Sequence, residues 1–226
     1  MLTEIKICGI TNVEDALHAA ACGADALGFI FYTGSPRCVT TEAAARIISS
    51  LPDSVVRVGV FVNEAPETVL AVRRTCGLDR IQLHGEETPE YCRRFPKGVL
   101  IKALSGRPKD VSFPLRDYPV VAFLLDAADK GRRGGTGKEA DWDLAARIAR
   151  RHPLILAGGL NEANIERALA RVGPRAVDIN SGVEASPGKK DPDKVRRIIE
   201  IIRRHTAGGH ACERLFTRET PGKSSC

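Results

Sequence analysis

The sequence predicts an α/β protein, a single (β/α)8 TIM barrel with a loose C-terminal tail. Strand-like apolar runs alternate with amphipathic helical segments along residues 1–205, and no linker divides them. The runs are nearly continuous in Val, Ile and Leu, which is typical of parallel strands buried on both faces. At 226 residues the chain is also within the size range of one such barrel. An open doubly wound sheet is the alternative, but a closed barrel leaves no strand edge exposed.

Eight short runs carry the strand pattern, which is the number that a closed barrel of βα units requires. Regular alternation with helices predicts right-handed crossovers between neighbouring parallel strands. In chain order the runs cover residues 4–8, 26–31, 57–62, 80–84, 98–103, 120–126, 154–159 and 176–180.

The segments between the strands show the spacing of apolar residues that gives a helix one buried stripe. Four of them match the i, i+3, i+4, i+7 pattern in full, starting from Val13, Ala44, Ile165 and Val195. Start signals support these helices: Thr11 and Glu14 form a capping box, and a cap precedes a proline at residues 88–89 and 191–192. Only residues 104–119, with three prolines, predict a short or irregular helix. The sequence thus predicts seven clear helices and one poor one.

The helical periodicity ends at His205. Residues 206–226 are polar and contain Gly and Ser, so they are expected to form a loose tail. The predicted organisation is one barrel domain over residues 1–205 followed by a tail over residues 206–226.

Composition excludes several classes of protein. Apolar residues make up 43% and charged residues 27%, the balance of an ordinary globular chain. No window reaches about 18 uninterrupted apolar residues, so no membrane association is expected. The N-terminus lacks the basic start and long apolar stretch of a signal peptide, so we expect a cytoplasmic protein.

The net charge of +6 does not by itself indicate nucleic-acid binding. Basic residues gather in "RIARRHP" and "VRRIIEIIRR", on the polar faces or last turns of helices, where cations complement the helix dipole. Aromatic residues are only 5% and do not alternate with the basic ones, so the stacking platform of a single-strand binder is missing. We expect no nucleic-acid partner.

The seven cysteines form no CxxC pair and no repeated short spacing, so neither a metal site nor a disulfide framework is expected. Cys22, Cys76 and Cys92 fall in helical segments, where a free cysteine behaves as a small hydrophobe. Cys8 differs because it ends the first strand and is followed by Gly9 and a helix start.

Catalytic side chains of a barrel lie where the strands end and the βα loops begin. Cys8 ends the first strand, His84 the fourth and Asp126 the sixth. A buried thiol is the alternative for Cys8, and a structural histidine bonded to the backbone is the alternative for His84. A helix cap explains Asp126 poorly, because no helical pattern begins until about Asp141.

Two glycine-containing loops follow the seventh and eighth strands, where barrels commonly hold a substrate phosphate. Gly158 and Gly159 lie in the first loop, and Ser181 and Gly182 in the second. Their backbone N–H groups can approach an anion closely, and Asn161 is expected to cap the following helix, whose N-terminus would contribute.

Two further loops lie at the predicted mouth. Arg37, after the second strand, is either a solvated loop arginine or a bidentate clamp for a carboxylate. The loop at residues 131–137, "GRRGGTG", is either a flexible surface loop or a cover for the site.

These motifs together resemble the phosphoribosylanthranilate isomerase family. The similarity runs in register from residue 4 to residue 204 and rests on "KICGIT", "GADALGFIFY", "QLHGEE", "GGTGK", "AGGLN" and "VDINSGVEASPGKKD". It implies a barrel without metal or organic cofactor that acts on a small phosphosugar, converting N-(5-phosphoribosyl)anthranilate into 1-(2-carboxyphenylamino)-1-deoxyribulose 5-phosphate in tryptophan biosynthesis.

The resemblance also implies roles for single residues. Cys8 matches the general base, Asp126 the general acid, and Arg37 the residue that holds the anthranilate carboxylate. The remaining predicted substrate-binding residues are His84, Gly158, Gly159, Asp178, Ser181 and Gly182. For this chemistry, the adjacent helix start is expected to lower the pKa of Cys8 towards neutrality, and partial burial is expected to keep Asp126 protonated.

Two alternative functions stay open at this point. The histidine-pathway isomerase performs the same Amadori step on a different amine, but related isomerases carry an aspartate where this chain has Cys8. A non-catalytic phosphate-binding barrel is the second alternative, and the presence of both Cys8 and Asp126 opposes it. The sequence predicts a monomer or a homodimer without deciding between them.

Overall fold

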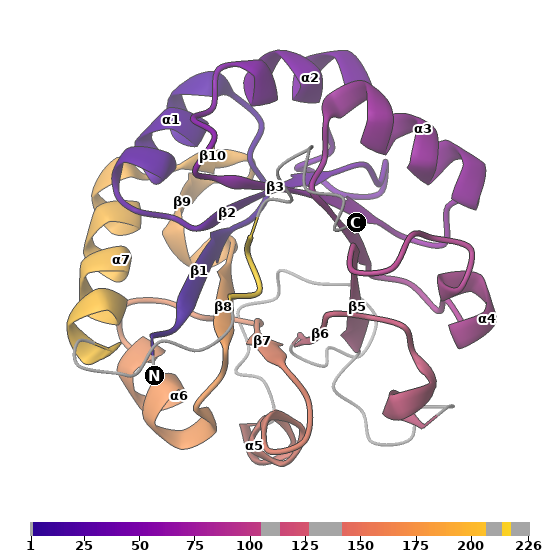
Figure 1. Ribbon diagram of the computed structural model, residues 1–226. Helices are drawn as coiled ribbons and strands as arrows, with labels where there is room; N and C mark the ends of the chain where they lie inside the picture. The colour runs from indigo at the N-terminus through magenta and orange to yellow at the C-terminus, as the bar shows by residue number, and fades with distance from the viewer. Residues whose placement is uncertain (1, 105–113, 127–141, 207–213, 218–226) are drawn as a thin grey trace, which may run out of the picture.

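A computed structural model describes residues 2–104, 114–126, 142–206 and 214–217, and its centre is a closed barrel of eight parallel strands (Figure 1). Each strand pairs with the next in the chain, and β8 pairs with β1 through four residue pairs from Glu4–Ala176 to Ile7–Ile179. The strands are β1 Glu4–Ile7, β2 Ala26–Ile30, β3 Val56–Phe61, β4 Arg80–Leu83, β5 Leu100–Leu104, β6 Ala122–Leu125, β7 Leu154–Leu156 and β8 Ala176–Ile179. The predicted fold and all eight predicted strands are confirmed.

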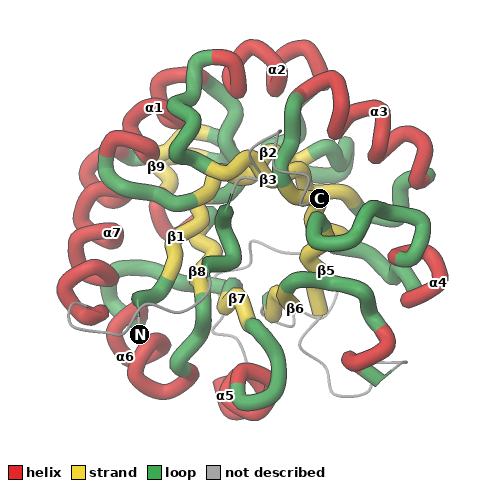
Figure 2. Tube along the Cα trace, viewed as in Figure 1, coloured by secondary structure: helices red, strands yellow, loops and turns green. Residues whose placement is uncertain are grey.

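In the described part of the chain, seven α-helices surround the strands (Figure 2). They are α1 Val13–Ala21, α2 Thr41–Ser49, α3 Pro66–Cys76, α4 Pro89–Cys92, α5 Trp142–Ala149, α6 Ile165–Val172 and α7 Pro192–Thr206. The link predicted to be irregular contains the short 3-10 helix Leu115–Asp117 in its described part. None of the described helices is long and apolar enough to cross a membrane.

The start of α1 differs from its prediction. Asn12, not Thr11, is the N-cap, and its side-chain oxygen accepts a hydrogen bond of 2.8 Å from the backbone N–H of Asp15. The Thr11 hydroxyl donates instead to the Gly188 carbonyl, in the turn of a small hairpin formed by β9 Glu184–Ser186 and β10 Lys189–Lys190. That hairpin was not predicted, because two strands this short leave no periodic signal.

The predicted cap of α6 is also displaced. Asn161 accepts a hydrogen bond from the Ala163 N–H, and the helix begins only at Ile165. Asn161 therefore shapes the turn that precedes the helix.

Side chains alternate along each strand between two cores. The outward residues pack against the helices in a large outer core that includes Ile5, Ile7, Leu27 and Phe29. The inward residues form a smaller inner core, which contains Ala157, directly after β7, and the strand residues Ala26, Val56, Val58, Ile101, Ala103, Ala122, Leu124, Ile155 and Ala176.

The bottom of the inner core is lined by small side chains. Ala26, Ala122 and Ala176 are the first residues of β2, β6 and β8, so the N-terminal end of the barrel is wide inside. Leu215 and Phe216 fill this space and are 8% and 4% exposed. Figure 1 shows the short yellow segment inside the ring of strands.

Two buried charged residues hold this segment, residues 214–217, in the barrel. The carboxylate of Glu4, the first residue of β1, accepts the backbone N–H of Leu215 at 2.6 Å and that of Phe216 at 3.1 Å. Arg80, the first residue of β4, donates to the Thr217 carbonyl at 2.9 Å. The prediction of a loose tail from residue 206 did not anticipate this contact, because its signal is the set of small residues at the strand starts and not the tail's own sequence.

Removing the docked segment should lower stability more than removing the residues after it. A chain ending at Thr206 loses Leu215 and Phe216 from the core and leaves Glu4 without its two backbone partners. Burial of Phe216 alone predicts a loss of about 3 kcal/mol in the free energy of unfolding for Phe216→Ala.

The matched control is a chain ending at Thr217, which keeps all the described contacts of the segment. Urea unfolding followed by circular dichroism should separate the two truncations. Equal midpoints would show that the segment does not stabilise the barrel.

Candidate active site

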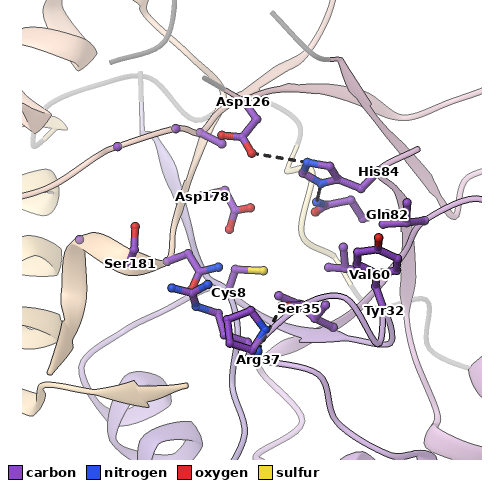
Figure 3. Close-up of a pocket in the computed structure, with 18 of the residues that line it drawn as sticks. Cys8, Tyr32, Ser35, Arg37, Val60, Gln82, His84, Asp126, Asp178 and Ser181 are labelled. Atoms are coloured by element: carbon purple, nitrogen blue, oxygen red, sulfur yellow. Dashed lines mark hydrogen bonds and ion pairs between the residues drawn. The ribbon is translucent and has the colours of Figure 1, made fainter. Parts of the chain in front are cut away.

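All nine residues that the sequence assigned to the site line one pocket at the C-terminal ends of the strands (Figure 3). They are Cys8, Arg37, His84, Asp126, Gly158, Gly159, Asp178, Ser181 and Gly182. Residues far apart in the chain thus converge because the barrel brings the carboxyl ends of all eight strands to one rim.

Cys8 lies directly after β1, where its backbone N–H still bonds to the Ile179 carbonyl of β8 at 2.9 Å. Its side chain points into the pocket (Figure 3) and is 4% exposed. Gly28 of β2 makes room for it: a Cβ there would lie 2.6 Å from the Cys8 sulfur and 3.1 Å from Cε of Lys6. Because Gly28 has no side chain, the Cys8 thiol and the end of the Lys6 side chain can both pack against its backbone.

Burial raises the pKa of the Cys8 thiol, and the cations of Lys6 and Lys190 oppose this only in part. The prediction that the helix start lowers this pKa is wrong in sign. Helix α1 begins only at Val13, after an Asn12 cap, so the helix N-terminus is not the dominant influence on the sulfur. The neutral thiol is therefore favoured.

A polar layer at the base of the pocket contains two residues that the sequence prediction missed, Lys6 and Gln82, beside the predicted Asp178. Lys6 is completely buried, and its ammonium lies 2.8 Å from Oδ2 of Asp178 and 3.0 Å from Oε1 of Gln82. Burial alone would lower the pKa of Lys6, but Asp178 and Cys8 outweigh this and raise it. The lysine therefore stays charged.

Asp178 offers one further acceptor to the pocket. Its Oδ1 is buried, and no donor among the described residues reaches it, although Oδ2 is paired with Lys6. Buried carboxylate oxygens are normally hydrogen-bonded, so this atom is suited to a hydroxyl of a bound molecule.

His84 and Asp126 face each other across one side of the pocket (Figure 3). Nε2 of His84 lies 3.5 Å from Oδ2 of Asp126, and Nδ1 lies 2.9 Å from Nε2 of Gln82. The two described contacts of the His84 ring are with side chains. They do not support the alternative of a structural histidine bonded to the backbone.

Arg37 is held by a carboxylate of its own chain. Nε and Nη2 lie 2.8 and 2.6 Å from the two oxygens of Glu184, the first residue of β9. Burial alone would raise the pKa of Glu184, but Arg37 and Lys190 lower it, so the carboxylate is charged. The bidentate edge of the guanidinium that was predicted to clamp a ligand is thus already in use, and Nη1 is the nitrogen outside this pair.

The two glycine loops meet at the rim. Gly158 and Gly159 have φ angles of 86° and 66°, a region that side chains other than glycine rarely adopt. Gly182 lies against the Leu160 carbonyl so closely that a Cβ would overlap it. At these glycines the loops after β7 and β8 therefore present backbone to the pocket. The predicted covering loop at residues 131–137 lies outside the described residues.

The described residues contain no group of three His, Cys, Asp or Glu side chains placed to bind a metal ion. The polar groups that line the pocket include a thiol, two carboxylates, a histidine, an arginine and the backbone of two loops. This set can move protons and bind an anionic ligand.

Comparison with known proteins gives a consistent result. The family model described as N-(5'phosphoribosyl)anthranilate (PRA) isomerase matches residues 5–201. An N-(5'-phosphoribosyl)anthranilate isomerase of Syntrophus aciditrophicus is 53% identical over 204 residues, which cover 90% of this chain and 89% of that protein.

Solved structures agree. The crystal structure of phosphoribosylanthranilate isomerase from Thermotoga maritima is 43% identical, with a TM-score of 0.79 over 89% of this chain and 98% of that one. A second structure, of the isomerase in complex with reduced 1-(o-carboxyphenylamino)-1-deoxyribulose 5-phosphate, is 43% identical, with a TM-score of 0.77 and the same coverage.

The raised pKa of Cys8 predicts how this thiol reacts with iodoacetamide. Only the thiolate is alkylated, and a pKa above the ordinary value of 9.0 makes the thiolate scarcer at pH 7 than in a free cysteine. Alkylation of Cys8, followed by mass spectrometry of its peptide, should be slow at pH 7 and should still accelerate above pH 9.

Replacing Lys6 by Met should slow the reaction further, because it removes a cation that favours the thiolate. A rate that levels off below pH 8 would contradict the burial effect.

Proposed function

The chain belongs to the N-(5'-phosphoribosyl)anthranilate isomerase family, and we propose that Cys8 and Asp126 are the base and the acid of its reaction. The protein isomerises N-(5'-phosphoribosyl)anthranilate in tryptophan biosynthesis, an Amadori rearrangement that yields 1-(2-carboxyphenylamino)-1-deoxyribulose 5-phosphate. One observation carries the assignment of roles: a thiol from the end of β1 and a carboxyl group from the end of β6 line the same pocket.

The first step needs an acid. Asp126 gives its proton to the ring oxygen of the ribose, and the bond between that oxygen and C1 breaks with its electron pair going to the oxygen. The lone pair of the anthranilate nitrogen forms a C=N bond to C1, which gives a protonated Schiff base. Asp126 suits this step because its side chain is 14% exposed, at the rim and not in bulk water.

The second step needs a base. The Cys8 thiolate takes the proton from C2, and the electrons of the C–H bond form a C1=C2 double bond while the π electrons of the C=N bond return to the nitrogen. The resulting enolamine tautomerises to the amino ketone. Because burial favours the neutral thiol, the Lys6 and Lys190 cations are the groups that make the thiolate accessible. The base is therefore electrostatically dependent on the layer below it.

The rest of the pocket positions the substrate. Backbone groups of Gly158, Gly159, Ser181 and Gly182 bind the phosphate, as expected for the loops after the seventh and eighth strands of a barrel. The unpartnered Oδ1 of Asp178 accepts a hydrogen bond from a sugar hydroxyl. The two ends of the sugar phosphate are thereby fixed around the reacting carbons.

Arg37 binds the anthranilate carboxylate through the edge that Glu184 leaves available. Glu184 holds the guanidinium plane from the side, so the substrate meets a cation whose orientation is already set. This differs from a free bidentate clamp, because one carboxylate of the protein shares the arginine with the substrate.

We further propose a cytoplasmic enzyme that acts on a small molecule without a nucleic-acid or membrane partner, as a monomer or a homodimer. Light scattering coupled to size-exclusion chromatography decides the oligomeric state. The family match removes the alternative of a histidine-pathway isomerase.

Replacing the acid or the base should abolish most turnover. Positioned acids and bases are worth about 100-fold to 10,000-fold each, so Cys8→Ala and Asp126→Asn should each lower kcat by that order. The assay follows the loss of phosphoribosylanthranilate generated from anthranilate and phosphoribosyl pyrophosphate.

Cys76→Ala and Cys92→Ala are the controls, because both thiols are buried outside the pocket and should affect only stability. Near-normal turnover of Cys8→Ala would refute its role as the base. No catalysed loss with the unmodified chain would refute the function itself.

Arg37→Lys should not act as a conservative change. A lysine can pair with Glu184 or with the substrate but cannot hold both through a planar fork. We expect a higher KM for the anthranilate substrate and a much smaller change for an aniline analogue without the carboxylate. Equal changes for the two compounds would show that Arg37 does not bind the carboxylate.

A further inference from the structure

We propose that Gln82 is a positioning residue that holds His84 as its neutral Nε2–H tautomer, with the N–H directed at Asp126. The series consists of Lys6 in β1, Gln82 in β4, and His84 and Asp126 directly after β4 and β6. Hydrogen bonds join the first three side chains, and a contact of 3.5 Å joins His84 to Asp126. The inference rests on the proposed function only for the role of Asp126, and the tautomer itself is tested in the free protein.

The series starts at Lys6, whose ammonium is completely buried. An ammonium has three donors and no acceptor, so the Gln82 atom at 3.0 Å from it must be the carbonyl oxygen Oε1. The opposite orientation of the amide would place its NH2 group against the positive charge. Lys6 in turn is fixed by Asp178 at 2.8 Å, and therefore the amide of Gln82 has one orientation.

The orientation of the Gln82 amide then sets the tautomer of His84. With Oε1 turned to Lys6, the NH2 group of Gln82 is the atom 2.9 Å from Nδ1 of His84. An amide NH2 only donates, so Nδ1 must accept and carries no proton. The proton of the neutral ring is then on Nε2, which lies 3.5 Å from Oδ2 of Asp126.

Burial makes this arrangement hard to escape. Gln82 is 1% exposed, so water does not replace either of its hydrogen bonds. Its backbone is fixed in β4 opposite Val60 of β3 and Ile101 of β5, and the His84 N–H bonds to the Phe61 carbonyl at 2.8 Å. A doubly protonated ring would place an N–H at Nδ1 against the NH2 group of Gln82.

The tautomer matters because of what Asp126 must do. An acid has to deliver its proton to the substrate, and a free ring nitrogen beside it would compete for that proton. In the Nε2–H tautomer the nitrogen that faces Asp126 already carries a proton and cannot accept another. His84 can then orient the carboxyl group without taking its proton.

The chain is well suited to a direct measurement, because it contains a single glutamine and only five histidines. Labelling these two residue types with 15N should give an unprotonated Nδ1 and a protonated Nε2 for His84. A coupling between Nε2 of Gln82 and Nδ1 of His84 should be detectable across the hydrogen bond. The His84→Asn variant assigns the signals. A protonated Nδ1 in the unmodified protein would overturn the proposal.

Gln82→Glu reverses the hydrogen bond without changing the shape of the side chain. A carboxylate accepts, so Nδ1 of His84 should become protonated, while the other four histidines keep their signals. We expect kcat to fall with little change in KM, by less than the roughly 100-fold minimum loss expected when the acid itself is removed. Unchanged His84 signals in Gln82→Glu would refute the assignment.

Gln82→Met is the matched control, since it keeps the length of the side chain and removes both hydrogen bonds. It should leave His84 in a mixture of tautomers and reduce kcat less than Gln82→Glu. Equal losses in the two variants would show that Gln82 acts through packing alone. If Asp126→Asn keeps full turnover while the tautomer is as described, the role of Asp126 fails and the positioning of His84 stands.

Discussion

The ion pair between Lys6 and Asp178 joins the two strands that close the barrel and separates its packed interior from its reactive end. An ammonium with no solvent exposure is costly to bury, and removing one partner of such a pair costs about 3–5 kcal/mol because the other charge is left uncompensated. Apolar residues of similar volume are often as stable in such positions, so stability alone does not explain the pair. The charge of Lys6 has two other effects: it favours the thiolate form of Cys8, and it fixes the orientation of the Gln82 amide.

Along β1 and the residue that follows it, the inward side chains occupy three levels of the barrel with different roles. Glu4 at the bottom binds the backbone of the docked tail segment, Lys6 lies in the middle, and Cys8 reaches the pocket. Strand β4 repeats the order with Arg80, Gln82 and His84. Stabilising contacts therefore lie at one end of the strands and chemistry at the other, which is the division expected of this fold.

Much of this could be predicted from the sequence, because strand periodicity and the ends of strands are local signals. The eight strands follow from their apolar runs. The residues predicted at the ends of the first, fourth and sixth strands line one pocket with those of the glycine loops. The docking of residues 214–217 was missed because its signal is the small side-chain volume at three strand starts, which leaves space inside the barrel. These residues, Ala26, Ala122 and Ala176, lie on three different strands. The pKa of Cys8 was misjudged because burial, which the sequence shows only indirectly, is the largest influence on it and raises it.

Two residues of the layer at the base of the pocket were missed for a more general reason. Lys6 lies two residues before Cys8, and Gln82 lies two residues before His84, so each points to the same side of its strand about 7 Å deeper. A polar residue at that position, inside an otherwise apolar strand, is the signal that could have found them. This layer also explains how one cation can influence both the base and the acid of the reaction. Lys6 acts on Cys8 through its charge and on Asp126 through the directions of two hydrogen bonds. One buried group therefore adjusts both the base and the acid.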